Sequence, residues 1–154
     1  MVPSDVIWEG WGVENRTAGF SWRGKPLDYV PYLGMGEAIA SMNTEDRIAM
    51  RVPHDDGRAA YPETIVAARI PVEDIEEPVF LLGGMADQVW ASGEMAINIA
   101  ETRNRHGLDT ELFIYDGAGH GLSGPATLPS GRAEAKAKQE AFPALLDFFE
   151  RTLR

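Results

Sequence analysis

The stretch 78–84, Pro-Val-Phe-Leu-Leu-Gly-Gly, is a continuous apolar run closed by two glycines. A run of this kind is typical of a strand that is buried on both faces, as in a parallel sheet. A helix is expected from about Gly93 to Arg105, with Ser92 as its N-cap, and a second strand over residues 111–115. Residues 78–116 therefore predict a strand–helix–strand unit with parallel strands and a right-handed crossover.

The rest of the chain is predicted around this unit. Residues 71–154 are the expected βαβα core, which ends in a helix from about Arg132 to Thr152. Residues 1–70 are expected to be irregular and cap-like, with short helices. Within them the pattern predicts loops over 1–36, a helix over 37–50, a turn at 53–57 and a short helix from Pro62 to about Ile70. The sequence thus favours a single α/β domain over residues 1–154.

The composition of the chain indicates which kinds of binding partner are unfavourable. The chain has 154 residues, of which 44% are hydrophobic and 25% charged, as in a soluble globular domain. A net charge of −10 disfavours binding to nucleic acid or to an anionic membrane surface. No apolar run is long enough to span a membrane, and the first residues lack the pattern of a secretory signal. Without cysteine there is no disulfide and no cysteine nucleophile, so we expect a cytoplasmic protein.

Two residues that could carry chemistry follow the two expected strands. Asp87 comes shortly after the first strand, and His120 follows the second between two glycines. The carboxyl ends of parallel strands meet at one edge of a sheet, where functional residues gather. The carboxylate would accept a hydrogen bond from one ring nitrogen and leave the other nitrogen to act as a base. Taken singly, each residue has an ordinary alternative, a turn or cap aspartate and an exposed histidine.

Other candidate functional residues have weaker support from the sequence. Trp90 is expected to pack over the Asp87 loop, with a wall of a substrate site as the alternative. Residues 54–56, His-Asp-Asp, look like metal ligands, but an aspartate-rich turn in solvent is favoured because no third ligand stands at a suitable spacing. We therefore expect no metal and no cofactor.

Several pieces of the sequence, in this order, resemble one known family. It is the C-terminal domain shared by acyl-CoA thioesterases and bile-acid-CoA:amino-acid N-acyltransferases, a dienelactone-hydrolase-like branch of the α/β-hydrolases. The resemblance rests on the segments 2–8, 22–27, 30–32, 70–73 and 84–92, and on His106-Gly107, Tyr115, Gly119-His120 and Pro125.

The resemblance implies roles for the two candidates. Asp87 takes the place of the triad acid and His120 that of the general base. The family commonly has two acids in the first loop, and here Ala86 stands at the first position. The family's nucleophile, a serine or cysteine on a strand-to-helix turn, lies upstream of the first matching segment. This sequence has no Gly-x-Ser-x-Gly and no cysteine, and the nearest imitation, residues 121–124, follows the histidine.

We therefore expect a truncated α/β-hydrolase fold with a small parallel sheet and flanking helices. The expected function is that of a hydrolase remnant without hydrolase activity of its own, which binds an acyl or small-molecule ligand or a partner. One alternative is an active esterase or thioesterase that uses Asp87 and His120 with a non-standard or partner-supplied nucleophile. Another is a fragment of a longer thioesterase-like enzyme. Open strand edges and uncovered apolar faces favour a homodimer.

Overall fold

The computed structural model describes residues 3–11, 16–45, 50–120 and 129–153. The chain divides into two compact units. The first unit comprises Met1–Ser4, Pro71–Asp87 and Ala91–Arg154, and the second comprises Asp5–Ile70 and Gln88–Trp90. The single domain expected over residues 1–154 stays a prediction.

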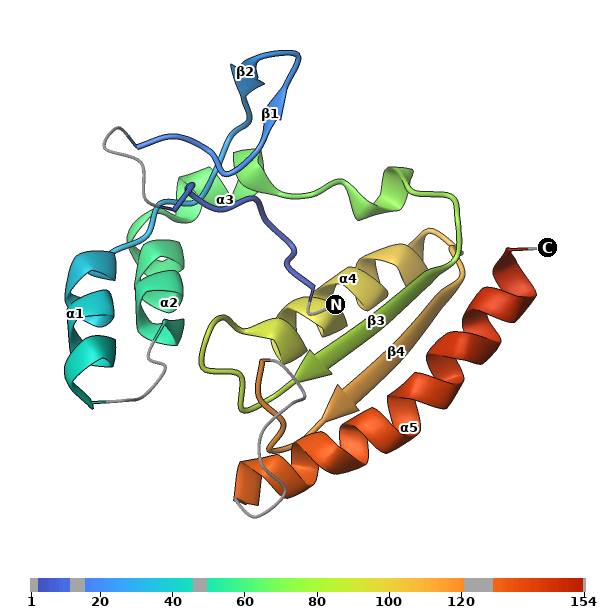
Figure 1. Ribbon diagram of the computed structural model, residues 1–154. Coiled ribbons are helices and arrows are strands. Elements are labelled where there is room, and N and C mark those ends of the chain that lie inside the picture. The colour runs from blue at the N-terminus through green and yellow to red at the C-terminus, as the bar shows by residue number, and fades with distance from the viewer. Residues whose placement is uncertain (1–2, 12–15, 46–49, 121–128, 154) are drawn as a thin grey trace. The chain divides into compact units, whose positions relative to one another are not determined.

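The first unit is built on two parallel strands (Figure 1). Strand β3 (Val79–Gly84) pairs with β4 (Thr110–Tyr115), so that Gly84 and Tyr115 stand side by side at the carboxyl ends. Helix α4 (Ser92–Arg105) connects them, and a short 3-10 helix (Val72–Asp74) precedes β3. The strand–helix–strand unit predicted from residues 78–116 is confirmed, with strand and helix boundaries that differ by a residue.

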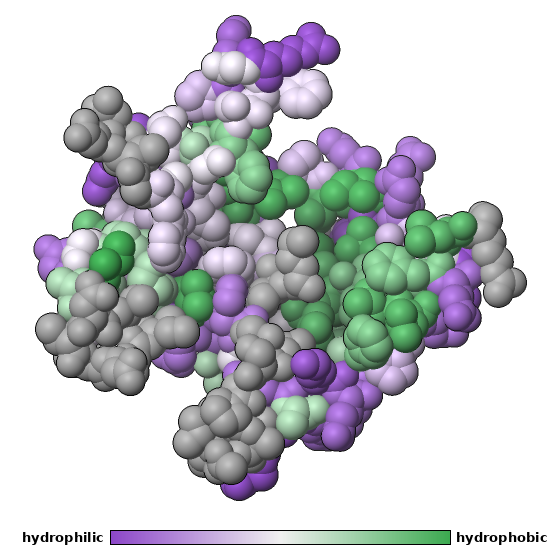
Figure 2. Space-filling view, in the orientation of Figure 1, coloured by the Kyte–Doolittle hydropathy of each residue, from purple (hydrophilic) through white to green (hydrophobic). Residues whose placement is uncertain are grey.

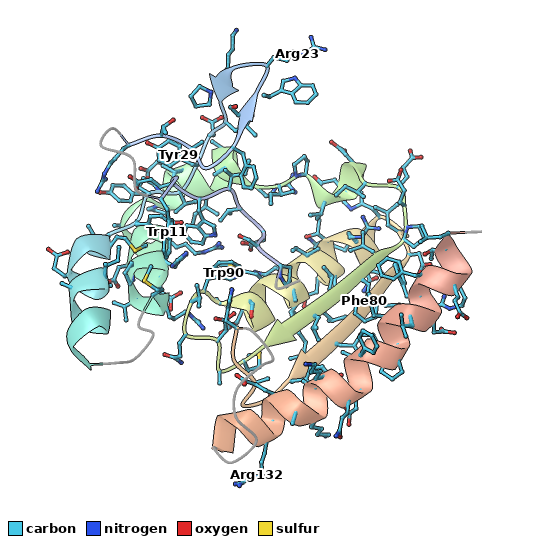
Figure 3. The ribbon with its side chains drawn as sticks, in the orientation of Figure 1. Trp11, Arg23, Tyr29, Phe80, Trp90 and Arg132 are labelled. Carbon is cyan, nitrogen blue, oxygen red and sulfur yellow. The ribbon has the colours of Figure 1, made fainter. Side chains whose placement is uncertain are left out.

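Helices α4 and α5 cover opposite faces of this small sheet. Side chains alternate between the two faces of a strand. Phe80 points to the face where α5 (Pro129–Thr152) supplies Phe148, with ring centroids 5.5 Å apart (Figure 3). Gly83 points to the other face, where a Cβ would come within 2.7 Å of the Ser92 carbonyl oxygen on α4. The unit is thus a mixed helix and strand arrangement around a small parallel sheet, compatible with a truncated α/β fold.

The second unit holds helices and a short antiparallel hairpin. The hairpin pairs β1 (Ser21–Trp22) with β2 (Lys25–Pro26), within a stretch expected to be loops. The helices are α1 (Met35–Glu45), α2 (Arg51–Ala60) and α3 (Pro62–Ala68). No helix in the described part of the chain combines the length and the hydropathy that a membrane span requires.

The turn predicted at residues 53–57 is wrong, because these residues lie inside α2. Pro53 falls in the first turn of the helix, where an amide N–H has no helical partner and a proline is tolerated. Arg51 and Asp55 form an ion pair one turn apart, with 2.6 Å between Nε and Oδ2. Turn-forming residue types are therefore compatible with a helix at this position.

Candidate active site

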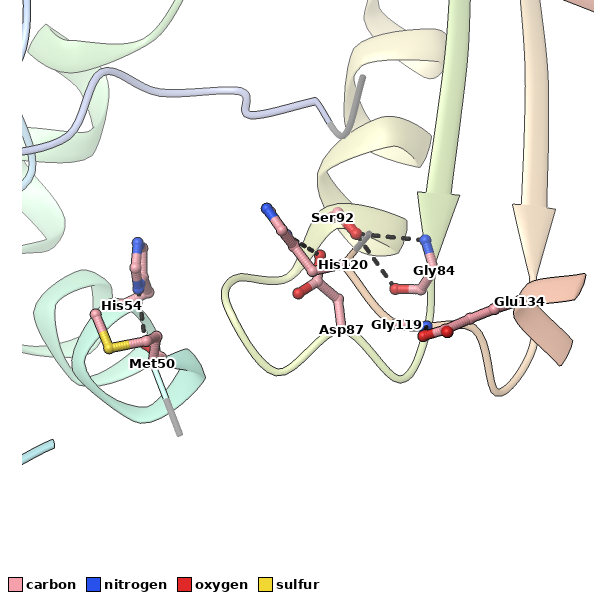
Figure 4. Close-up of polar contacts among 8 residues, drawn as sticks. All are labelled: Met50, His54, Gly84, Asp87, Ser92, Gly119, His120 and Glu134. Carbon is pink, nitrogen blue, oxygen red and sulfur yellow. Dashed lines mark hydrogen bonds and ion pairs between the residues drawn. The ribbon is translucent and has the colours of Figure 1, made fainter. Parts of the chain in front are cut away.

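The structure brings Asp87 and His120 together at the carboxyl ends of β3 and β4. The Nδ1 atom of His120 lies 3.0 Å from Oδ2 of Asp87 (Figure 4). Asp87 follows the end of β3 and His120 follows the end of β4, and the register places these two ends side by side. The parallel pairing is thus the reason that residues 33 positions apart in the sequence can meet.

The two members of this pair differ in exposure. The side chain of Asp87 is 0% exposed, whereas that of His120 is 31% exposed. A buried carboxylate needs hydrogen-bond donors, and the ring N–H of a histidine is one. A carboxylate can only accept a hydrogen bond. Of the two neutral tautomers of His120, the pairing therefore favours the one with its proton on Nδ1. The remaining ring nitrogen, Nε2, then carries the lone pair of a base.

Backbone hydrogen bonds join the two loops that carry the pair. The Met85 amide donates to the Tyr115 carbonyl, and the Ala86 amide donates to the Ala118 carbonyl, each at 3.1 Å. A Cβ at Gly84 would lie 2.3 Å from the Ala118 carbonyl oxygen, so this close approach requires glycine at position 84. Gly84, the last residue of β3, therefore lets the two loops pack directly on each other.

Ser92 is not the N-cap residue that the sequence predicted. The N-cap of α4 is Ala91, and Ser92 is the first residue of the helix. The Ser92 hydroxyl is buried and exchanges hydrogen bonds of 3.3 Å with both the amide and the carbonyl of Gly84. It forms a link between α4 and the end of β3, and the prediction of a capping serine is wrong.

Glu134 is a residue of this region that the sequence did not single out. It lies on α5, is 8% exposed, and its Oε1 accepts a hydrogen bond from the Gly119 amide at 3.1 Å. One feature of the sequence could have identified Glu134. Ala133, Ala137 and Ala141 recur at helical spacing, and an acid beside such an apolar stripe stands at the edge of the buried face.

The solvent-exposed turn expected for residues 54–56 is wrong for His54. This side chain is 1% exposed, and its ring lies among the rings of Trp8, Tyr32 and Trp90, with centroids 4.5, 4.8 and 5.8 Å away. Its Nδ1 lies 2.7 Å from the Met50 carbonyl oxygen, which can only accept, so Nδ1 carries the proton. Trp90 is thus a partner of His54 in the second unit, and its role toward a substrate stays a prediction.

Metal ligands do not gather in the residues that the structure describes. Within these ranges no three His, Asp or Glu side chains are placed so that they could hold an ion. The expected absence of a metal and of a cofactor stays a prediction. Residues 121–124, which imitate a nucleophile motif, lie outside the described residues together with Pro125.

An apolar groove of about 580 Å³ lies between β3 and α5 in the first unit. Figure 2 shows hydrophobic side chains gathered over these elements. Nine apolar residues and one lysine line it: Pro78, Val79, Phe80, Leu82, Lys138, Ala141, Phe142, Leu145, Phe148 and Phe149. Its volume falls within the range of small-molecule sites in proteins.

An acid and a histidine on loops after neighbouring parallel strands are placed as α/β-hydrolases place two members of their triads. Residues 40–131 match the family model described as BAAT / acyl-CoA thioester hydrolase C terminal. The match covers more than half of the chain and includes both Asp87 and His120. The chain therefore belongs to this family, as the resemblance in its sequence had implied. Comparison with curated proteins gives no match.

Proposed function

We propose that Asp87 and His120 are the acid and the general base of an acyl-transfer site that acts on acyl esters or thioesters. The observation that carries the proposal is the 3.0 Å pairing of a fully buried carboxylate with Nδ1 of a partly exposed imidazole. Membership of the acyl-CoA thioester hydrolase C-terminal family supports the substrate class.

The chemistry follows from the two ring nitrogens. Nε2 of His120 takes the proton of a hydroxyl, thiol or water as that group's oxygen or sulfur attacks the acyl carbonyl carbon. The carbonyl oxygen becomes an oxyanion, and Asp87 stabilises the imidazolium that has formed. As the carbon–sulfur or carbon–oxygen bond to the leaving group breaks, Nε2 returns the proton to that group. Asp87 keeps its charge throughout and holds the ring in one orientation.

The attacking group is not assigned to a side chain of this sequence. The 154 residues contain no cysteine and no Gly-x-Ser-x-Gly. The Ser92 hydroxyl is engaged with Gly84 in the link between α4 and β3. We therefore propose that the chain contributes the acid–base half of the site, and that water or a group from another polypeptide segment is the nucleophile.

Turnover of an aryl ester and of an acyl-CoA thioester tests the proposal. We expect His120→Ala to lower the rate of the purified chain by about 10²- to 10⁴-fold, the usual share of general acid–base catalysis. His106→Ala is the matched control, because His106 is exposed at the end of α4 and should keep the wild-type rate. Equal rates in a folded wild type and in His120→Ala would contradict the proposal.

A second candidate is a domain that binds an acyl ligand without turning it over. The absence of a nucleophile motif in the sequence and the apolar groove on α5 favour it. Calorimetric titration with a non-hydrolysable acyl-CoA thioether distinguishes the two candidates. Saturable binding by a wild type that shows no turnover would support the binding domain. The expected homodimer stays a proposal, which sedimentation equilibrium tests.

A further inference from the structure

A buried acid stands directly beside the loop that carries His120. Glu134 is 8% exposed, and its Oε1 lies 3.1 Å from the amide nitrogen of Gly119, the residue before His120 (Figure 4). Carboxylates are rarely buried unless they accept hydrogen bonds. The amide of Gly119 supplies one such bond, so the burial of Glu134 and the path of the His120 loop depend on each other.

The backbone before His120 is fixed at successive residues. The Ala118 amide donates to the Tyr115 carbonyl at 3.3 Å, and the Ala118 carbonyl accepts from the Ala86 amide at 3.1 Å. Both of these are backbone bonds, which do not depend on a particular side chain. The next amide along, that of Gly119, is held by the side chain of Glu134. This bond can therefore be removed by a single side-chain substitution that leaves the Asp87–His120 pair in place.

The fit between Gly119 and Glu134 is close. A Cβ at position 119 would lie 2.6 Å from Oε1 of Glu134, so the carboxylate would have to shift away from its present place. Glycine at position 119 therefore lets the backbone approach the carboxylate closely enough for the hydrogen bond. The hydrogen bond to Glu134 thus holds the backbone one residue before His120.

From this geometry we infer that Glu134 is a positioning residue for His120. Its acceptor oxygen holds the Gly119 amide and thereby keeps the imidazole in reach of Asp87. The importance of this for acyl transfer rests on the proposed function, because small displacements of a catalytic group cost rate. The effect of Glu134 on the order of the His120 ring does not depend on catalysis, so it can be measured separately from turnover.

Two substitutions at position 134 separate the acceptor from the charge. Glu134→Gln keeps an oxygen at the same reach and removes the charge. Glu134→Asp keeps the charge and withdraws the oxygen by one methylene. Glu140→Gln is the control, because Glu140 is exposed on the same helix and pairs with Lys136. Each folded variant is examined for the order of the His120 ring by carbon-13 relaxation, with the His106 ring as an internal reference, and for thioester turnover.

We expect Glu134→Asp to loosen the His120 ring and to lower turnover by about 10- to 100-fold. Glu134→Gln and Glu140→Gln should keep both properties within about twofold, since the acceptor to Gly119 is retained. An unchanged His120 ring in Glu134→Asp, or equal loosening in Glu134→Gln, would overturn the inference. A wild type without turnover would count against the proposed function alone, because the ring order still decides the role of Glu134.

Discussion

Replacing Arg103 with methionine should destabilise the first unit by about 3–5 kcal/mol, because the hydrogen bonds of its buried guanidinium to backbone carbonyls are lost. Arg103 is 0% exposed. Its guanidinium has five N–H donors and makes five hydrogen bonds, one to a hydroxyl and four to backbone carbonyls. The acceptors are Thr110 Oγ1 at 2.9 Å and the carbonyls of Val72 at 2.9 Å, Ile75 at 2.6 Å, Glu77 at 2.8 Å and Asp109 at 3.0 Å.

These acceptors explain the size of the effect. They belong to the segment that leads into β3 and to the start of β4, so Arg103 ties the end of α4 to the amino ends of both strands. Methionine fills a similar volume but donates no hydrogen bond. Denaturant unfolding followed by far-ultraviolet circular dichroism measures the change. Arg105→Met is the control, because Arg105 is exposed and its hydrogen bond among the described residues is a local one, to Thr102. Equal stability of the two variants would contradict this account of Arg103.

Replacing Asp87 with asparagine should lower acyl-transfer turnover by about 10²- to 10⁴-fold while the fold is kept. Asparagine has the same shape, so it can occupy the buried position. Its amide nitrogen donates, and an amide turned toward Nδ1 favours the tautomer with the proton on Nε2, which cannot act as a base. The expected loss is therefore in kcat, with a smaller change in KM.

The matched control for Asp87→Asn lies one loop away. Asp116 is exposed just after β4, so Asp116→Asn changes the net charge by the same amount near the same sheet edge. It should turn over substrate at the wild-type rate. If both variants lost activity to the same extent, the effect would be one of charge, and the paired geometry of Asp87 and His120 would not be the cause.

The sequence predicted best the strand–helix–strand unit, because general rules for parallel strands limit how such a unit can be arranged. A continuous apolar run, a helix of ordinary length and a second apolar run leave few arrangements, since crossovers between parallel strands are right-handed. The register that follows sets the ends of β3 and β4 side by side. That topology alone was enough to predict the meeting of Asp87 and His120, which the 3.0 Å contact confirms.

Local composition predicted the structure less well where tertiary contacts determine the conformation of a segment. Pro53 to Gly57 are turn-forming residue types, yet they lie in α2, where His54 is buried among aromatic rings. The burial of that ring stabilises the helix against the local preference. Ser92 has the residue type of an N-cap, but its hydroxyl bonds to Gly84, eight residues earlier. Contacts of this kind depend on where other elements lie, which local pattern does not specify.

Nitrogen-15 NMR of the histidine rings tests the pairing of Asp87 with His120 most directly. The two ring nitrogens of a neutral imidazole have distinct chemical shifts, according to which one carries the proton. We expect neutral His120 to carry its proton on Nδ1, facing Asp87, and this preference to disappear in Asp87→Asn while the signals of His106 stay unchanged. A neutral His120 protonated mainly on Nε2 in the wild type would contradict this expectation, because the base that acyl transfer needs would then be absent.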